Sequence, residues 1–166
     1  MVHHNKNLSN LKNLIEKFEI SEGNNLNLIT ENANSNTIFD NQQLILNNIL
    51  HCADISNPAK ISKVYKKWVD LVFIEFFNQG DMEKKQDLPI SLLCDRETTI
   101  IPKCQIGFIK FVVKPSFDVL KIISPEINTY CDNIIKNLKM YEEEVKKMEV
   151  DGERSKIENK GSSRKF

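Results

Sequence analysis

Glycine and proline are scarce in this chain of 166 residues, which contains five of each. Long runs of apolar residues are also missing, and none approaches the roughly 20 residues that a membrane-spanning helix needs. Basic and acidic residues balance at 23 each, so no bulk charge favours a nucleic acid polymer or an anionic membrane. Because few residues interrupt its periodic segments, the sequence predicts an all-α helical bundle.

Paired cysteine motifs are absent as well. The four cysteines stand at positions 52, 94, 104 and 131, without CxxC spacing and in apolar surroundings. This pattern predicts buried, reduced thiols and therefore a cytoplasmic location. The polar start of the chain, residues 1–5, does not resemble a signal peptide. No membrane segment is expected in this chain, which leaves open an anchor in a longer parent protein.

Apolar spacing and capping signals predict five main helices, near 7–19, 40–54, 59–79, 103–122 and 125–149. The Asn-rich segment 21–40 lacks a period and is expected to be a loop, after which Asp40 caps a helix. The helix that follows Pro58 is expected to end near Gly80, ahead of a connector over 81–101 that is mobile at 82–88. Pro115 is expected to kink or end its helix.

The last helix carries an apolar stripe from Ile127 to Met148 at alternating steps of four and three residues. The stripe spans barely three heptads, so a helix packed on the core is favoured over a coiled-coil dimer. Ser124 is expected to cap this helix. Residues 151–166 are polar and charged, and we predict a disordered tail there after a single domain over 1–150.

Two short motifs carry most of the chemical information. HCADISNP (51–58) places the carboxylate of Asp54 near the end of a helix, and a carboxylate is a hard ligand for divalent metals. QIGF (105–108) places the carboxamide of Gln105 about one helical turn before the ring of Phe108. A carboxamide can pair with the edge of a purine, and a neighbouring ring can stack on the base.

From Leu8 to about Lys146 the chain resembles the C-terminal half of the catalytic domain of class I 3′,5′-cyclic nucleotide phosphodiesterases. The motifs that carry the resemblance are HCADISNP (51–58), Trp68, EFFNQGD (75–81), CDR (94–96) and QIGFIKFVV (105–113). The resemblance implies hydrolysis of cyclic nucleotides to 5′-monophosphates in second-messenger signalling. It also implies two divalent metals, zinc with magnesium or manganese, in the complete enzyme. The family's His-Asn-x-x-His motif and His-Asp pair belong to the other half and do not occur here.

The resemblance also assigns roles to individual residues. It makes Asp54 a ligand of the first metal, whereas the residue alone would be read as a helix-terminal cap. It makes Gln105 the purine-binding amide, although most glutamines are simply exposed. Four further residues are implied to line the nucleotide pocket, and each has a plain structural alternative in packing or capping: Phe108, Val72, Phe76 and Asn57.

Three other candidates are given structural roles. His51 is interpreted as a supporting or core residue, because the family's general acid belongs to the missing half. Trp68 is interpreted as core. A metal site built from His3, His4 and Asp54 is disfavoured, since adjacent histidines on a helix point in different directions and these two lie at a chain terminus.

The missing half leaves no catalytic residue in this fragment, and one carboxylate cannot build a two-metal centre. We therefore expect the chain alone to be inactive and to expose apolar faces on the helices over 40–54 and 59–79, which favour self-association. The run 107–112 resembles members selective for cyclic GMP, so cyclic GMP is expected to be favoured over cyclic AMP. The alternative is a non-catalytic helical interaction module that uses the stripe over 127–148.

Overall fold

The computed structural model describes residues 35–162 together with Ser9 and Asn13. The predicted helix over 7–19 and the two N-terminal histidines lie outside the described residues, apart from these two positions. The described elements are α2 (Ser35–Asp54), the 3-10 turn η2 (Asn57–Ala59), α3 (Ser62–Lys85), α4 (Ile101–Phe108), the π-helical segment η3 (Ile109–Val113), α5 (Lys114–Ile123), the 3-10 turn η4 (Pro125–Ile127) and α6 (Asn128–Ser162). No strand occurs among them, which confirms the all-α prediction.

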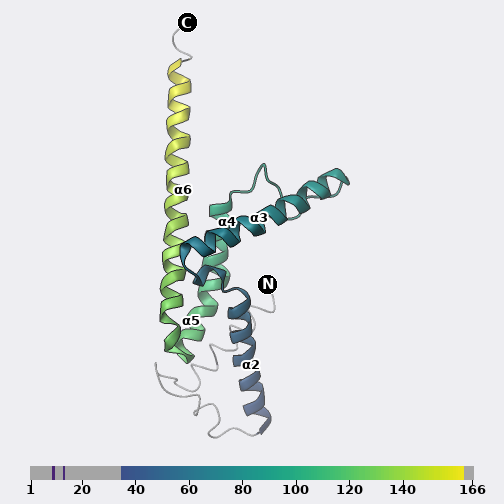
Figure 1. The fold of residues 1–166 in the computed structure, drawn as a ribbon, viewed down its shortest axis with the longest axis vertical. Coiled ribbons are helices and arrows are strands. Elements are labelled where there is room, and N and C mark those ends of the chain that lie inside the picture. Colours follow the sequence, from purple (N-terminus) through teal and green to yellow (C-terminus); the bar gives the residue numbers. More distant parts are fainter. Residues whose placement is uncertain (1–8, 10–12, 14–34, 163–166) are drawn as a thin grey trace.

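The long helix α6 is the element along which the other helices are arranged (Figure 1). The nearly continuous helix made by α4, η3 and α5 runs beside it, and α2 packs against α5 on the side away from α6. Helix α3 starts near α6, crosses α4 and then extends away from the body (Figure 1). A connector over residues 86–100 returns from the far end of α3 to α4.

The core lies where these helices meet. Its buried members come from α2, α3, η3, α5 and α6 and include Cys52, Tyr65, Val69, Phe73, Ile109, Val113, Phe117, Ile134 and Tyr141. Ile134 and Tyr141 belong to the stripe on α6, so this helix packs on the core as predicted. At the end of the stripe, Met148 is 52% exposed.

The predicted start of α2 and the predicted end of α3 are wrong. Helix α2 begins at Ser35, so Asp40 lies within it and does not cap it. Helix α3 continues through Gly80 to Lys85. A Cβ atom on Gly80 would lie 2.0 Å from the carbonyl oxygen of Cys94, so this glycine allows the connector to approach the helix and does not end it.

Pro115 interrupts the α-helical pattern, as predicted. Proline has no N–H to offer the carbonyl of Phe111, four residues earlier. The main chain adopts π-helical turns over Ile109–Val113 before this proline, and α5 begins at Lys114. Ser116 helps by donating its hydroxyl to the carbonyl oxygen of Val112 at 2.7 Å. The interruption is therefore absorbed locally, and the two α-helical parts remain one rod.

Helix α6 continues to Ser162, through most of the segment for which we expected disorder. Glutamate and lysine are good helix formers, and adding residues to a formed helix is cheap compared with starting one. The disordered tail expected over 151–166 remains a prediction. Over the described residues, no helix is long and apolar enough to cross a membrane.

Candidate functional site

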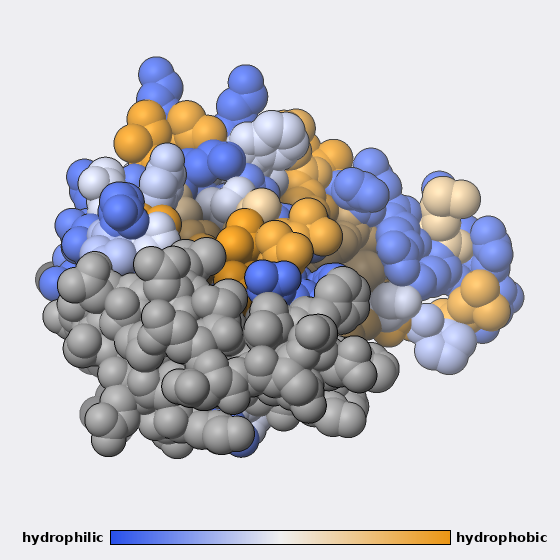
Figure 2. Space-filling model, turned by 90° about the horizontal axis from the view of Figure 1, so that it is seen from below, coloured by the Kyte–Doolittle hydropathy of each residue, from blue (hydrophilic) through white to orange (hydrophobic). Residues whose placement is uncertain are grey.

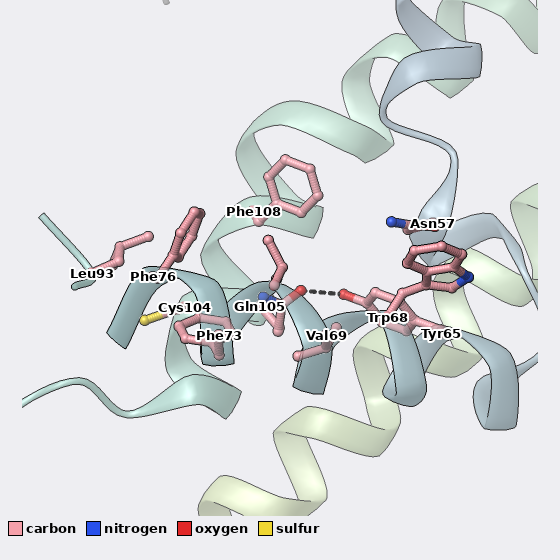
Figure 3. A pocket seen from close by; sticks show the side chains of 11 residues that line it. Asn57, Tyr65, Trp68, Val69, Phe73, Phe76, Leu93, Cys104, Gln105 and Phe108 are labelled. Atoms are coloured by element: carbon pink, nitrogen blue, oxygen red, sulfur yellow. Dashed lines mark hydrogen bonds between the residues drawn. The ribbon is translucent and has the colours of Figure 1, made fainter. Parts of the chain in front are cut away.

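A pocket of about 240 Å³ lies between α3 and α4 (Figure 3). Its wall from α3 is made by Tyr65, Trp68, Val69, Val72, Phe73 and Phe76. Cys104, Gln105 and Phe108 line it from α4, Asn57 from the turn η2, and Leu93 from the connector. Most of these side chains are apolar, and Gln105 and Asn57 add amide groups, which is the usual composition of a small-molecule site.

Gln105 is the central polar group of the pocket. Its side chain is only 7% exposed, and its Oε1 accepts a hydrogen bond from the hydroxyl of Tyr65 at 2.5 Å (Figure 3). Burial, reinforced by neighbouring Tyr141, raises the pKa of Tyr65 above its ordinary value, so the hydroxyl keeps its proton and remains a donor. In this structure the amide of Gln105 turns Oε1 toward Tyr65 and leaves its Nε2 group to serve the pocket.

Tyr65 is the functional residue that sequence reasoning missed. It stands 40 residues from Gln105, and its ring meets the ring of Tyr141 edge-on, with centroids 5.7 Å apart. The available signal was the four-residue spacing of Tyr65, Val69 and Phe73, which are the buried positions of α3. Trp68, for which we predict a core position, belongs to a different face of this helix.

The structure brings all five predicted nucleotide contacts into this one pocket. Phe108 and Val72 are 37% and 36% exposed, so both present apolar surface to a ligand. Phe76 is half-buried and packs edge-on against Phe73. Asn57 is the first residue of η2 and does not cap α3, which begins later with Ile61 at its N-cap. Their roles toward a nucleotide remain predictions.

The predicted core position of Trp68 is wrong, because this side chain is 51% exposed at the pocket edge. Val64 and Leu71, which lie on the same side of α3, are 37% and 47% exposed. On α2, three large apolar residues are also exposed: Leu46, Ile49 and Leu50. These helices therefore expose apolar faces, as the half-domain interpretation predicts, and Figure 2 shows apolar side chains reaching the surface.

Asp54 is the last residue of α2 and is exposed. Among the residues that the structure describes, no group of three or more His, Cys, Asp or Glu side chains could hold a metal ion. The described residues therefore do not by themselves fit a site for two resident metal ions. His51 is half-buried in the last turn of α2 and does not line the pocket.

The connector over 86–100 is tied to the end of α3 by charged contacts. Arg96 donates two hydrogen bonds to the carboxylate of Asp81, at 3.0 and 2.5 Å. Glu83 accepts hydrogen bonds from the backbone N–H and the hydroxyl of Ser91, both at 2.7 Å. Leu93, which faces the pocket, has a φ of 70°, a left-handed conformation that is uncommon for a residue with a branched side chain. These bonds attach the connector to α3 at residues 91 and 96, and the mobility expected at 82–88 stays a prediction.

The four thiols form no disulfide. Cys52 and Cys94 are buried, and Cys104 and Cys131 are half-buried. Burial, with a smaller contribution from Cys131, raises the pKa of Cys52 to about 12. Burial also raises the pKa of Cys104, the thiol in the pocket. Protonated thiols are poor nucleophiles, so none of these cysteines is a candidate for covalent catalysis.

Comparison with known proteins identifies the family of this chain. Residues 1–134 match the model of the 3′5′-cyclic nucleotide phosphodiesterase family. Two curated relatives from Drosophila melanogaster, 3′,5′-cyclic-AMP phosphodiesterase isoform F and isoforms N/G, are each 39% identical over 99 residues. That stretch is 59% of this chain but only 15% and 10% of theirs, so the chain spans a small part of these relatives.

Solved structures give the same result. The phosphodiesterase domain of the RhoPDE fusion protein from the choanoflagellate Salpingoeca rosetta superposes with a TM-score of 0.71 and 28% identity, over 90% of this chain and 44% of that one. The structure of LmjPDEB1 in complex with IBMX gives a TM-score of 0.67 at 24% identity, over 88% and 40%. The family match and the fold agree, and this chain belongs to the 3′5′-cyclic nucleotide phosphodiesterase family.

Proposed function

We propose that the protein to which this chain belongs hydrolyses 3′,5′-cyclic nucleotides to 5′-monophosphates, and that this chain supplies its purine pocket. The observation that carries the proposal is the buried, oriented amide of Gln105 in an apolar pocket beside the ring of Phe108. A purine offers two flat faces and an edge that both donates and accepts hydrogen bonds. Phe108 and Val72 suit the faces, and Gln105 suits the edge. The unpaired thiols support a cytoplasmic location.

The fixed amide should make the pocket prefer one purine. On its Watson–Crick edge adenine offers a donor at N6 and an acceptor at N1, whereas guanine offers an acceptor at O6 and a donor at N1. Tyr65 holds Oε1 of Gln105, so the amide does not turn freely to serve both. Since the relatives that match this segment are named cyclic-AMP phosphodiesterases, we propose cyclic AMP as the preferred substrate. Cyclic GMP, which the run 107–112 favours, is the alternative.

Binding is tested on the chain itself, because Trp68 is its single tryptophan and lines the pocket. Cyclic AMP should quench or shift the fluorescence of Trp68 saturably, and Gln105→Ala should weaken this binding by a few kcal/mol at most. The substitution removes two neutral hydrogen bonds of about 1 kcal/mol net each. Equal affinity for cyclic AMP, cyclic GMP and a pyrimidine cyclic nucleotide would contradict the purine assignment. Unchanged affinity in Gln105→Ala would contradict it as well.

Hydrolysis requires groups that this chain does not encode, so the purified chain should not hydrolyse cyclic nucleotides. Activity should appear when the missing half of a phosphodiesterase domain is supplied, and Asp54→Ala should then abolish it. Asp132→Ala removes an equally exposed carboxylate from α6 and is the matched control, with activity retained. Metal-dependent hydrolysis by the chain alone would overturn the proposal that the groups needed for hydrolysis come from the missing half. A complemented complex that binds but hydrolyses nothing would favour the interaction module.

A further inference from the structure

The short link between α2 and α3 is held in place from outside by α6. Asn137 on α6 is completely buried, and its Nδ2 donates to the carbonyl oxygens of Pro58 and Lys60, both at 2.8 Å. Asn133, one turn earlier, donates to the carbonyl oxygen of Ala59 at 3.0 Å. Two asparagines of one helix thus satisfy three successive carbonyls of the turn that carries Asn57 into the pocket.

This arrangement is specific for the amide group. The backbone hydrogen bonds along this link end on the carbonyls of Ser56, Asn57 and Ile61, whereas the carbonyls of residues 58–60 receive their donors from α6. The Oδ1 atom of Asn137 is buried without a hydrogen-bond partner among the described residues, and burying such an atom is unfavourable. An apolar side chain would avoid that cost, so the value of Asn137 lies in its two donated hydrogen bonds and not in packing.

The same face of α6 also reaches the other polar group of the pocket. Asn133, Asn137 and Tyr141 follow each other at steps of four residues, which places them on one side of the helix. The ring of Tyr141 packs edge-on against Tyr65, the residue that holds Gln105. One helix face therefore supports Asn57 through the turn and Gln105 through Tyr65.

We propose that Asn137, assisted by Asn133, is a positioning residue for the nucleotide pocket, acting on the backbone of 58–60 to fix Asn57 at the pocket. Neither asparagine lines the pocket, and each acts through the turn. The pocket part of the inference rests on the proposed function. The anchoring of the turn can be measured independently of any ligand.

The anchoring is tested by amide hydrogen exchange of the whole chain. Asn137→Leu keeps a similar volume and removes the donors, so exchange over 55–61 should become at least about tenfold faster, while α4 stays protected. Ser116→Ala is the control, because Ser116 is also completely buried but bonds to Val112 and not to the turn. Should Asn137→Leu fold poorly, Asn133→Ala removes one bond only and should loosen the same segment by a smaller factor. Unchanged exchange over 55–61, or an increase equal to that in Ser116→Ala, would overturn the proposal.

The consequence for binding is tested with cyclic AMP and the fluorescence of Trp68. Asn137→Leu should weaken binding about three- to tenfold, and the loss should be absent in an Asn57→Ala background, because both changes act through Asn57. Additive losses would show that Asn137 does not act through Asn57 and would overturn the positioning role. The two proposals can also fail separately. If Asn137→Leu speeds exchange over 55–61 but the wild-type chain binds no cyclic nucleotide, the anchoring of the turn is confirmed and the proposed function is rejected.

Discussion

Tyr65→Phe should destabilise the chain by removing one hydroxyl from its interior. The change keeps the ring that packs against Tyr141 and deletes only the hydrogen bond to Oε1 of Gln105, an amide that is 7% exposed. A buried acceptor that loses its partner costs about 1–3 kcal/mol. With a urea dependence of about 2 kcal/mol per molar, the unfolding midpoint should fall by about 1 M.

The assay is urea unfolding followed by circular dichroism at one fixed chain concentration. Tyr130→Phe is the matched control, since Tyr130 is 54% exposed and its hydroxyl can bond to water, so its midpoint should not move. A double variant with Gln105→Leu tests the pair, because removing both partners should cost clearly less than the sum of the single changes. Equal midpoints for the Tyr65 and Tyr130 variants, or additive losses in the double variant, would refute the assigned hydrogen bond.

Three further outcomes are expected. Gly80→Ala should destabilise the fold by about 1–3 kcal/mol, because the added Cβ meets the backbone of Cys94. Gly152→Ala is the control and should leave the stability unchanged, because a Cβ there meets nothing within 4 Å. Similar melting temperatures for both variants would count against the close approach at Gly80. The pKa of Asp81 is lowered from its usual value of 3.8, chiefly by the hydrogen bond from Arg96. The contact therefore stabilises the connector fully at pH values above 3.8. This stabilisation is lost as the pH falls through the lowered pKa. Amide exchange over 86–100, corrected for intrinsic rates, should rise in acid, and Asp81→Asn should show the same rise at pH 7. Phe108→Ala should weaken cyclic nucleotide binding by about 1–3 kcal/mol for both purines alike, and a loss confined to one purine would argue against stacking.

The sequence predicted the helical class and the members of the pocket better than the way the pocket is held. Gln105 and Phe108 are one turn apart, so a local motif is enough to bring them together. The partner of Gln105 is 40 residues away, and the donors to the turn after Asp54 are 74 to 79 residues from their acceptors. Contacts of this kind depend on how helices pack, and residue spacing along one helix does not determine that.

The misassigned face of α3 has a similar cause. Val64, Trp68 and Leu71 are as apolar as the residues that are buried, and helical spacing allows either set to face the core. In this chain Tyr65, Val69 and Phe73 pack inward. This chain covers less than half of the solved phosphodiesterase domains that it resembles, and under the proposed function we expect the exposed set to face the remainder of such a domain.

The last prediction concerns the end of the chain. The family match stops at residue 134, yet Asn137 and Tyr141, which hold the turn and Tyr65, follow it. A chain trimmed to 1–134 would leave the carbonyls of Pro58 and Lys60 without their donors and Tyr65 without its ring partner. It should lose helical signal beyond that of the deleted residues and fail to bind cyclic AMP, whereas a chain of 1–150 keeps every one of these contacts. Equal affinity of the two truncated chains would show that α6 beyond residue 134 does not support the pocket.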